Sequence, residues 1–293
     1  MKDYVLLTDS CCDLGPELAQ ELGVEVLPLS FMMDGKEYFN YLDGREMAPE
    51  DFYARVRGGS LGTTSAISVG VFHEAMENLL KSGKDVLCVA FSSALSTTYQ
   101  SATIAAEELR AQYPDSRVMV VDSRAASLGQ GLLVALAVEQ KRAGKSIEEV
   151  AAYVEETRDH LCHWFTVDDL YHLKRGGRVS AAAALFGTML QMKPVLHVDD
   201  EGHLIAIGKV RGRKQSLTAL VDRMAEKMGK NGNRIVFISH GDCEEDADYI
   251  AEQVRKRFGI KSFIINEIGP SIGSHSGPGT VALFFVGDNR HEK

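Results

Sequence analysis

The run Asp85-Val86-Leu87-Cys88-Val89-Ala90-Phe91 reads as one continuous apolar strand, and the hydroxyl-rich segment Ser92-Ser93-Ala94-Leu95-Ser96-Thr97-Thr98 follows it directly. A strand that is apolar along its length is buried on both faces, which is typical of parallel sheets covered by helices. Similar runs lie on either side in the chain: Tyr4-Val5-Leu6-Leu7, Val24-Glu25-Val26-Leu27 and Arg117-Val118-Met119-Val120-Val121. Because amphipathic segments alternate with these runs, the sequence predicts an α/β fold.

A second α/β unit is expected from about residue 160 onward. A hairpin is predicted there from 194–198 and 204–208, with Asp200-Glu201-Gly202 as its turn. Helices near 217–228 and 246–258 and strands at 234–239 and around Phe263 and Phe284 follow it. Because 293 residues exceed the usual size of one core, we predict two domains, 1–160 and 161–293.

Charge and composition exclude several function classes. The formal net charge of -9 disfavours binding to nucleic acid and to anionic membrane surfaces. The chain opens directly into a strand, and no run approaches the roughly 18 apolar residues of a membrane span. We therefore expect a cytoplasmic protein without stable membrane insertion, in which the five cysteines are reduced thiols.

Hydroxyl side chains follow three of the predicted strands. They occur in Thr8-Asp9-Ser10, in 92–98 and in Asp122-Ser123, and Thr63-Thr64-Ser65 adds more in a stretch expected to lack regular structure. In open parallel sheets, ligands bind beyond the carboxyl ends of strands, where helix N-termini attract anions. These hydroxyls are therefore candidates for binding a carboxylate or a phosphate, and the alternative is that they only cap helices.

The segment 267–279 contains four glycines, two prolines, three serines and His275, and an apolar run, 280–286, comes next. We predict a constrained loop that holds His275 beside a buried strand as a polar anchor. The alternative is a surface turn with an incidental histidine. His160 and His163, with Cys162 between them on a possible helix, lack a carboxylate partner pattern, so no metal site is predicted.

Basic residues cluster at two places. Lys209, Arg211 and Arg213 alternate along an extended segment, which would place all three on one strand face, and Lys174, Arg175 and Arg178 form another group. On an acidic protein, such clusters indicate a docking patch for an acidic or phosphate-bearing partner. A solvated strand face is the alternative.

Ordered motifs extend over nearly the whole chain: Thr8-Asp9-Ser10, Asp13-Leu14, Pro28-Leu29, Thr64-Ser65, Ser92-Ser93-Ala94-Leu95-Ser96, Thr98-Tyr99, Asp122-Ser123, Leu173-Lys174-Arg175-Gly176-Gly177-Arg178, Lys193-Pro194, Arg211 and Ile272–Gly279. Together they resemble the DegV family of bacterial fatty-acid-binding proteins, which serve as acyl carriers for a fatty acid kinase. The resemblance implies two α/β domains that enclose a buried acyl chain, with no catalytic role, cofactor or metal. The expected partners are a long-chain fatty acid and the kinase.

The resemblance also implies roles for individual residues. Thr64 and Ser96 correspond to the carboxylate anchors, with His275 acting through their hydrogen-bond network. The neighbouring Ser65, Thr97, Gly273 and Ser274 are expected at the same ligand site. Arg175, Arg178 and Arg211 are expected where the kinase docks.

Two departures from the family pattern affect the expected head-group site. Where the family commonly has Thr-Ser-Gln-Pro-Ser, this chain has Thr64-Ser65-Ala66-Ile67-Ser68, and Thr97 replaces a glycine of Leu-Ser-Gly-Thr. The second change adds a Cβ atom at a backbone position that could need the freedom of glycine.

Two other function classes remain open from the residues alone. One is an acyl or phosphate-ester hydrolase with Ser96 as nucleophile and His275 as base, which needs an orienting acid and an oxyanion hole. The other is a binding module for a small phosphorylated metabolite. The apolar residues of 181–192 suit a tunnel wall between domains or, equally, an ordinary core.

Overall fold

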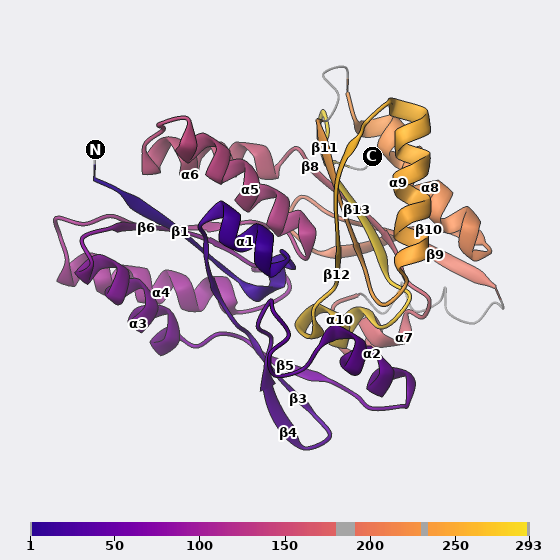
Figure 1. Ribbon diagram of the computed structural model, residues 1–293, viewed down its shortest axis with the longest axis horizontal. Helices are drawn as coiled ribbons and strands as arrows, with labels where there is room; N and C mark the ends of the chain where they lie inside the picture. Colours follow the sequence, from indigo (N-terminus) through magenta and orange to yellow (C-terminus); the bar gives the residue numbers. More distant parts are fainter. Residues whose placement is uncertain (1, 180–190, 230–233, 292–293) are drawn as a thin grey trace.

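The computed structural model describes residues 2–179, 191–229 and 234–291, whose strands form three sheets in a mixed α/β fold (Figure 1). The first sheet has the strand order β2-β1-β6-β7 and is parallel throughout. Its strands are β1 (Tyr4–Asp9), β2 (Glu25–Leu27), β6 (Asp85–Ala90) and β7 (Val118–Asp122). All four were predicted from apolar runs, and β1 and β6 are buried at every position.

Helices cover both faces of this sheet. Figure 1 shows α3 (Val69–Lys81) and α4 (Thr98–Gln112) on one side, and α5 (Leu128–Arg142) and α6 (Ile147–Arg158) on the other. Two of these helices have side-chain caps: Ser68 accepts a hydrogen bond from the Val71 amide, and Ser146 and Glu149 form a capping box. The short elements η1 (Ser10–Cys12) and α1 (Pro16–Leu22) follow β1.

The second sheet has six strands in the order β10-β9-β8-β13-β11-β12. They are β8 (Leu161–Thr166), β9 (Met192–Val198), β10 (Leu204–Arg211), β11 (Ile235–His240), β12 (Ser262–Glu267) and β13 (Val281–Val286). The predicted hairpin is present as the antiparallel pair β9–β10. Helices α8 (Arg213–Lys227) and α9 (Glu244–Phe258) cover one face, while the other packs on α5 and shares its core.

A small third sheet, β4-β3-β5, projects beside these two layers (Figure 1). It consists of β3 (Ser30–Met33), β4 (Lys36–Phe39) and β5 (Thr63–Ser65), and it packs with α2 (Pro49–Arg57). The prediction that 63–65 lacks regular structure was wrong, because β5 pairs antiparallel with β3, a partner more than thirty residues away.

Three further local predictions were wrong. The segment 267–279 contains the helix α10 (Pro270–Ser276), which starts with proline in its first turn and ends at Gly277 with φ 76°. His163 lies in β8 instead of a helix. Arg213 is the first residue of α8, so only Lys209 and Arg211 share a strand.

Most of the proposed tunnel wall at 181–192 lies outside the described residues, and Met192 begins β9. Among the helices that the structure describes, none combines the length and apolar character needed to cross a bilayer.

Candidate functional site

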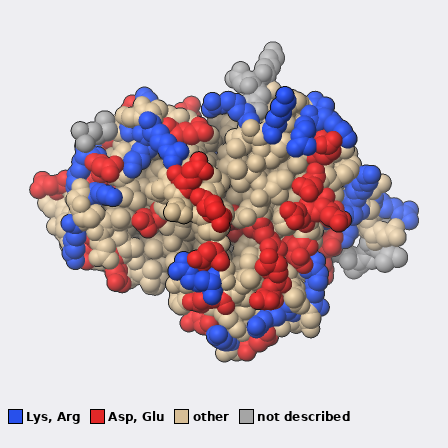
Figure 2. All heavy atoms as spheres, viewed as in Figure 1, with Lys and Arg blue, Asp and Glu red and all other residues tan. Residues whose placement is uncertain are grey.

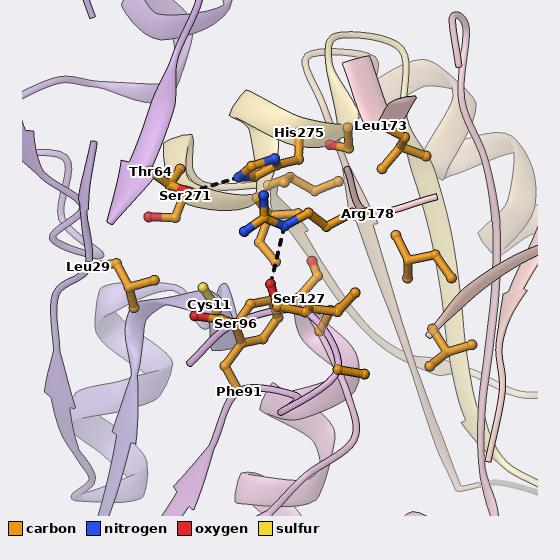
Figure 3. Close-up of a pocket in the computed structure, with 18 of the residues that line it drawn as sticks. Cys11, Leu29, Thr64, Phe91, Ser96, Ser127, Leu173, Arg178, Ser271 and His275 are labelled. Carbon is orange, nitrogen blue, oxygen red and sulfur yellow. Dashed lines mark hydrogen bonds between the residues drawn. The ribbon is translucent and has the colours of Figure 1, made fainter. Parts of the chain in front are cut away.

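A pocket of about 490 Å³ lies between the parallel sheet and the six-stranded sheet (Figure 3). Its walls come from η1, β5, the loop after β6, β8, α10 and β13. Apolar side chains dominate, and they include Leu29, Phe91, Leu95, Phe165, Leu173, Val198, Leu204, Ile268, Ile272, Ala282 and Phe284. Polar groups from Thr64, Ser96, Arg178, Ser271 and His275 accompany them. An apolar cavity of this size with few polar groups is typical of a small-molecule site.

The first polar pair joins His275 to Thr64. The Nε2 atom of His275, on α10, lies 2.7 Å from the Oγ1 atom of Thr64, on β5. Burial lowers the pKa of His275 to about 4, and the nearby charges of Arg178 and Arg175 lower it further in the same direction. The ring is therefore neutral at neutral pH, so it has one N–H donor and one acceptor nitrogen.

Ser96 lies just before α4, where the loop after β6 enters the helix. Its Oγ atom accepts a hydrogen bond from the Thr98 amide at 3.2 Å and lies 2.9 Å from the Thr98 hydroxyl. The hydroxyl thus helps to cap α4 and also lines the pocket. The neighbouring Thr97 has φ -76°, so replacing the family's glycine causes no backbone strain here.

Arg178 brings the positive charge of the site. Its side chain lines the pocket, and Figure 3 shows the guanidinium group near the His275 ring. Its Nε atom donates to the Leu95 carbonyl at 3.2 Å, which fixes the group beside the loop that carries Ser96. Burial lowers the pKa of Arg178 from its ordinary value of 12.5, yet an arginine stays charged in proteins.

Arg175 donates to the Ser274 carbonyl at 2.9 Å and to the Gly62 carbonyl at 3.4 Å. These bonds connect α7 (Tyr171–Arg175) with α10 and with the segment before β5. The docking role that the resemblance implies for Arg175 and Arg178 stays a prediction; both side chains are partly exposed and also donate to backbone carbonyls. Arg211, at the end of β10, is exposed.

Of the residues expected at the ligand site, Thr64, Ser65, Ser96, Thr97 and His275 line this pocket, whereas Ser274 and Gly273 do not. The Ser274 hydroxyl donates to the Pro270 carbonyl at 2.7 Å. A Cβ atom on Gly273 would come within 2.8 Å of Phe52 and Tyr53, so this side of α10 packs on α2. The helical period explains the difference, since it turns consecutive residues of α10 to different sides.

Ser271, Ser276 and His163 also line the pocket, and the sequence reasoning missed all three. The hydroxyls of Ser271 and Ser276 are buried and have no hydrogen-bond partner within the described part of the chain. Ser271 lies four residues before His275, a spacing that predicts a shared face only if the segment is helical. The glycines and prolines of 267–279 favour a loop, so the sequence did not predict the helix.

The hydrolase alternative requires a carboxylate that orients the catalytic histidine. Among residues 2–179, 191–229 and 234–291, the Nδ1 atom of His275 has no hydrogen-bond partner. The ring edge at Nδ1 instead adjoins Gly176. The geometry of Ser96 and His275 therefore gives a Ser-His-acid mechanism no support.

A buried polar chain connects the two large sheets next to the pocket. Asp13 accepts hydrogen bonds from the Gly269 amide at 3.0 Å and from the Ser127 hydroxyl at 2.5 Å, and the Ser127 and Ser239 hydroxyls lie 2.8 Å apart. Burial raises the pKa of Asp13 to about 8. When Asp13 is protonated it donates to Ser127, and Ser127 can then donate to Ser239, which satisfies the whole chain.

Charge on the surface is unevenly distributed. Figure 2 shows Asp and Glu gathered over the middle of one face, near α10 and α2, with Lys and Arg mainly around them. Glu267 lies near other carboxylates: burial raises its pKa to about 7, and Glu50, Asp242 and Glu244 raise it further in the same direction. An acidic surface here favours a partner with basic groups.

Comparison with known proteins places this geometry in context. The model of the DegV family of uncharacterised proteins matches residues 4–288. A DegV domain-containing protein of Clostridium perfringens is 45% identical, with 99% of each chain covered. A solved structure described as fatty acid binding by a DegV family protein from Thermus thermophilus has a TM-score of 0.87 and 34% identity, covering 98% of this chain and 100% of that one. A stearic acid-binding protein from Eubacterium ventriosum has a TM-score of 0.86 and 26% identity, covering 97% and 98%.

Proposed function

The chain belongs to the DegV family, and from that premise we propose that it binds one long-chain fatty acid in the pocket between its two large sheets. The observation that carries the proposal is the combination of an apolar cavity of about 490 Å³ with one cation and several hydroxyls. The relatives from Thermus thermophilus and Eubacterium ventriosum, described as binding a fatty acid and stearic acid, support the same ligand class. A small phosphorylated metabolite would leave the phenylalanine-lined walls without an apolar partner.

The carboxylate is anchored by Thr64, Ser96 and Arg178. A buried carboxylate costs several kcal/mol unless it is hydrogen-bonded, and charge-assisted bonds from short hydroxyls and a guanidinium offset that cost. His275 acts through Thr64: its Nε2–H donates to Oγ1, which leaves the Thr64 hydroxyl proton free to point at the carboxylate. In this role His275 positions a hydroxyl and transfers no proton to the ligand.

The acyl chain supplies the affinity. Burying about fourteen methylenes at roughly 0.8 kcal/mol each gives an upper bound near 11 kcal/mol, which exceeds the lower estimates of the cost of association. The head group then determines which end of the ligand is held at Thr64 and Ser96. Binding of this kind needs no cofactor, metal or catalytic step.

As a carrier, the protein presents its bound acid to a fatty acid kinase. Arg211 is the proposed docking residue, since it is exposed at the end of β10. The family resemblance implies the same role for Arg175 and Arg178, which also donate to the Ser274 and Leu95 carbonyls.

The proposal is tested by the lipid content of natively folded protein. Mass spectrometry of an organic extract from protein purified out of bacteria is expected to find fatty acid at about one equivalent per chain. Titration of the delipidated protein with octadecanoic acid then measures the affinity directly. An extract that holds only buffer components, together with no heat of binding, would exclude this function.

A further inference from the structure

The opening of the pocket is formed by two short segments. Among the pocket-lining residues that the structure describes, the exposed ones are Ser65, Ala66, Ser93 and Thr97. The first two lie at the end of β5, and the other two lie in the loop between β6 and α4. Thr64 and Ser96, the proposed carboxylate anchors, are their neighbours in the chain and are partly exposed. In the proposed complex, the carboxylate end of the fatty acid therefore lies at the opening, where a second protein can reach it.

Both segments belong to stretches without acidic or basic side chains. No Asp, Glu, Lys or Arg occurs at 58–73 or at 86–106, although 25% of the chain is charged. Helices α3 and α4 start shortly after the two segments and pack together through one core. Their first two turns expose Val71 (46%) and Ile104 (39%). The rim of the opening, defined here as Ser65, Ala66, Val71, Ser93, Thr97 and Ile104, is therefore uncharged and partly apolar.

Two charged groups adjoin the rim. The Asp122 carboxylate accepts hydrogen bonds from the Ser93 amide at 3.2 Å and from the Ser93 hydroxyl at 2.6 Å. On the inner side, Arg178 lines the pocket and donates to the Leu95 carbonyl at 3.2 Å. An anionic group that approaches here meets no carboxylate of the rim itself, whereas the acidic face in Figure 2 would repel it.

Phosphorylation of the bound acid requires direct access to its carboxylate. One carboxylate oxygen forms a bond to the γ-phosphorus of ATP, the bond from that phosphorus to the β–γ bridging oxygen breaks, and ADP leaves with the electron pair. The reacting atoms must first come within about 3–3.5 Å of each other, so the nucleotide has to reach the opening. An acyl phosphate is also sensitive to water, which a closed site excludes. A kinase that meets both conditions covers the rim.

We propose that the rim is the surface on which the fatty acid kinase docks, with the uncharged stretches at the centre of the interface and the ATP phosphates beside Arg178. The inference rests on the proposed function and adds a second contact surface to Arg211. The centres of protein interfaces are depleted in charged residues, as the rim is. A surface without carboxylates next to a guanidinium complements the negative charge of the nucleotide.

A lipid bilayer is the competing occupant of the rim. A fatty acid in a bilayer has its carboxylate at the surface and its chain inside. In the proposed complex the carboxylate also lies at the opening, so direct transfer from the bilayer would require the ligand to turn end over end. The orientation of the ligand therefore favours the kinase.

The test places a carboxylate in the rim without altering the lining of the pocket. Val71→Glu and Ile104→Glu do so, since neither residue lines the pocket. Asn78→Glu and Ala111→Glu are the matched controls, because each lies seven residues further along the same face of the same helix and is also exposed. All four variants are expected to bind octadecanoic acid with the affinity of the wild type.

Acyl phosphate formation is then measured with a purified bacterial fatty acid kinase and ATP over a range of carrier concentrations. Each rim variant is expected to raise the KM for the carrier by about tenfold or more and to change kcat by less than about threefold, because docking is weakened and the chemistry is not. The controls should keep KM within about twofold of the wild type. Val71→Gln adds similar bulk without charge and is expected to lie closer to the wild type than Val71→Glu.

Failure of this inference is distinct from failure of the proposed function. An unchanged KM in both rim variants overturns the docking surface and leaves the fatty-acid site intact. Slower uptake of octadecanoic acid from vesicles of phosphatidylcholine and phosphatidylglycerol, with an unchanged KM for the kinase, would assign the rim to a bilayer and also overturn it. If the wild type binds octadecanoic acid but yields no acyl phosphate, the carrier role and this inference both fail. If octadecanoic acid does not bind, the proposed function itself is wrong.

Discussion

A Cβ atom on Gly176 would overlap the Nδ1 edge of the His275 ring. Gly176 has φ -73°, a conformation open to any residue, so glycine is required here for space and not for backbone freedom. The start of the loop after α7 therefore lies directly against the imidazole, whose Nε2 atom on the opposite side lies 2.7 Å from Thr64 Oγ1. This contact links the Arg-Gly-Gly-Arg segment to the head-group site.

Gly176→Ala is therefore expected to displace His275 and weaken the binding of octadecanoic acid by about tenfold, through loss of the bond to Thr64. Gly208→Ala is the matched control, since a Cβ atom on Gly208 meets nothing within 4 Å. Calorimetric titration measures both. Equal affinities in the two variants would show that the position of His275 does not matter for the ligand.

Thr64→Val and Ser96→Ala are each expected to weaken binding by about 1–3 kcal/mol, because each removes a charge-assisted hydrogen bond to the carboxylate. Thr63→Val is the control for the first change, since Thr63 neighbours Thr64 on β5 without lining the pocket. Titration with octadecanoic acid is again the measurement. Unchanged affinity in both variants would remove these hydroxyls from the site.

The sequence predicts most of the regular structure because its strands carry strong local signals. The apolar run at 85–91 and the capping box at Ser146 need no tertiary information. The structure of β5 and α10 depends on distant partners instead: β5 pairs with β3, and α10 packs on α2 and α7. Local composition favours a loop at both places, so a single sequence cannot reveal them.

The same distinction holds for the site. Resemblance to the family suggested Thr64, Ser96 and His275 as site residues. The pocket-lining positions of Arg178 and His163 depend on the path of the loop after α7 and on the register of β8. The division at 160 and 161 stays a prediction. It agrees with the start of β8, the first strand of the six-stranded sheet along the chain, at Leu161.

Arg178→Met is expected to weaken fatty-acid binding and to reduce its dependence on salt, because the cation beside the carboxylate is lost. It should also raise the pKa of His275 from about 4 toward 6.5, since Arg178 is one of the charges that lower it. Histidine titration by NMR in the delipidated protein measures this shift. Lys174→Met, an exposed neighbour, is the control; a pKa that stays the same in both variants would place Arg178 away from His275.

Asp13→Asn is expected to change how stability depends on pH. Burial raises the pKa of Asp13 from 3.8 to about 8, so the folded state holds a proton that the unfolded state releases between these values. This contribution to stability is lost as pH rises through that window, whereas Asn donates to Ser127 at every pH. The difference in free energy of unfolding, variant minus wild type, should therefore be larger at pH 8 than at pH 4 by at least about 1 kcal/mol.

Urea unfolding at a series of pH values measures that difference, in which the contributions of other groups cancel. Asp115→Asn, at an exposed position, is the control and should give a difference that does not vary with pH. A flat difference for Asp13→Asn as well would mean that Asp13 is ionised in the folded protein.

The last prediction concerns the proposed docking of a fatty acid kinase. Arg211 is exposed at the end of β10, where Lys209 precedes it by two residues on the same strand, whereas Arg213 is engaged with Asp246 at 2.8 Å and Asp168 at 3.6 Å. Arg211→Ala should leave the bound fatty acid in place but lower the rate of acyl phosphate formation with a fatty acid kinase and ATP, most clearly at low salt. Arg257→Ala, which removes a surface arginine paired with Asp222, should keep the wild-type rate. Equal rates for Arg211→Ala and wild type at low and moderate salt would mean that the kinase docks on another surface, and loss of lipid from Arg211→Ala would mean that this arginine supports the pocket instead.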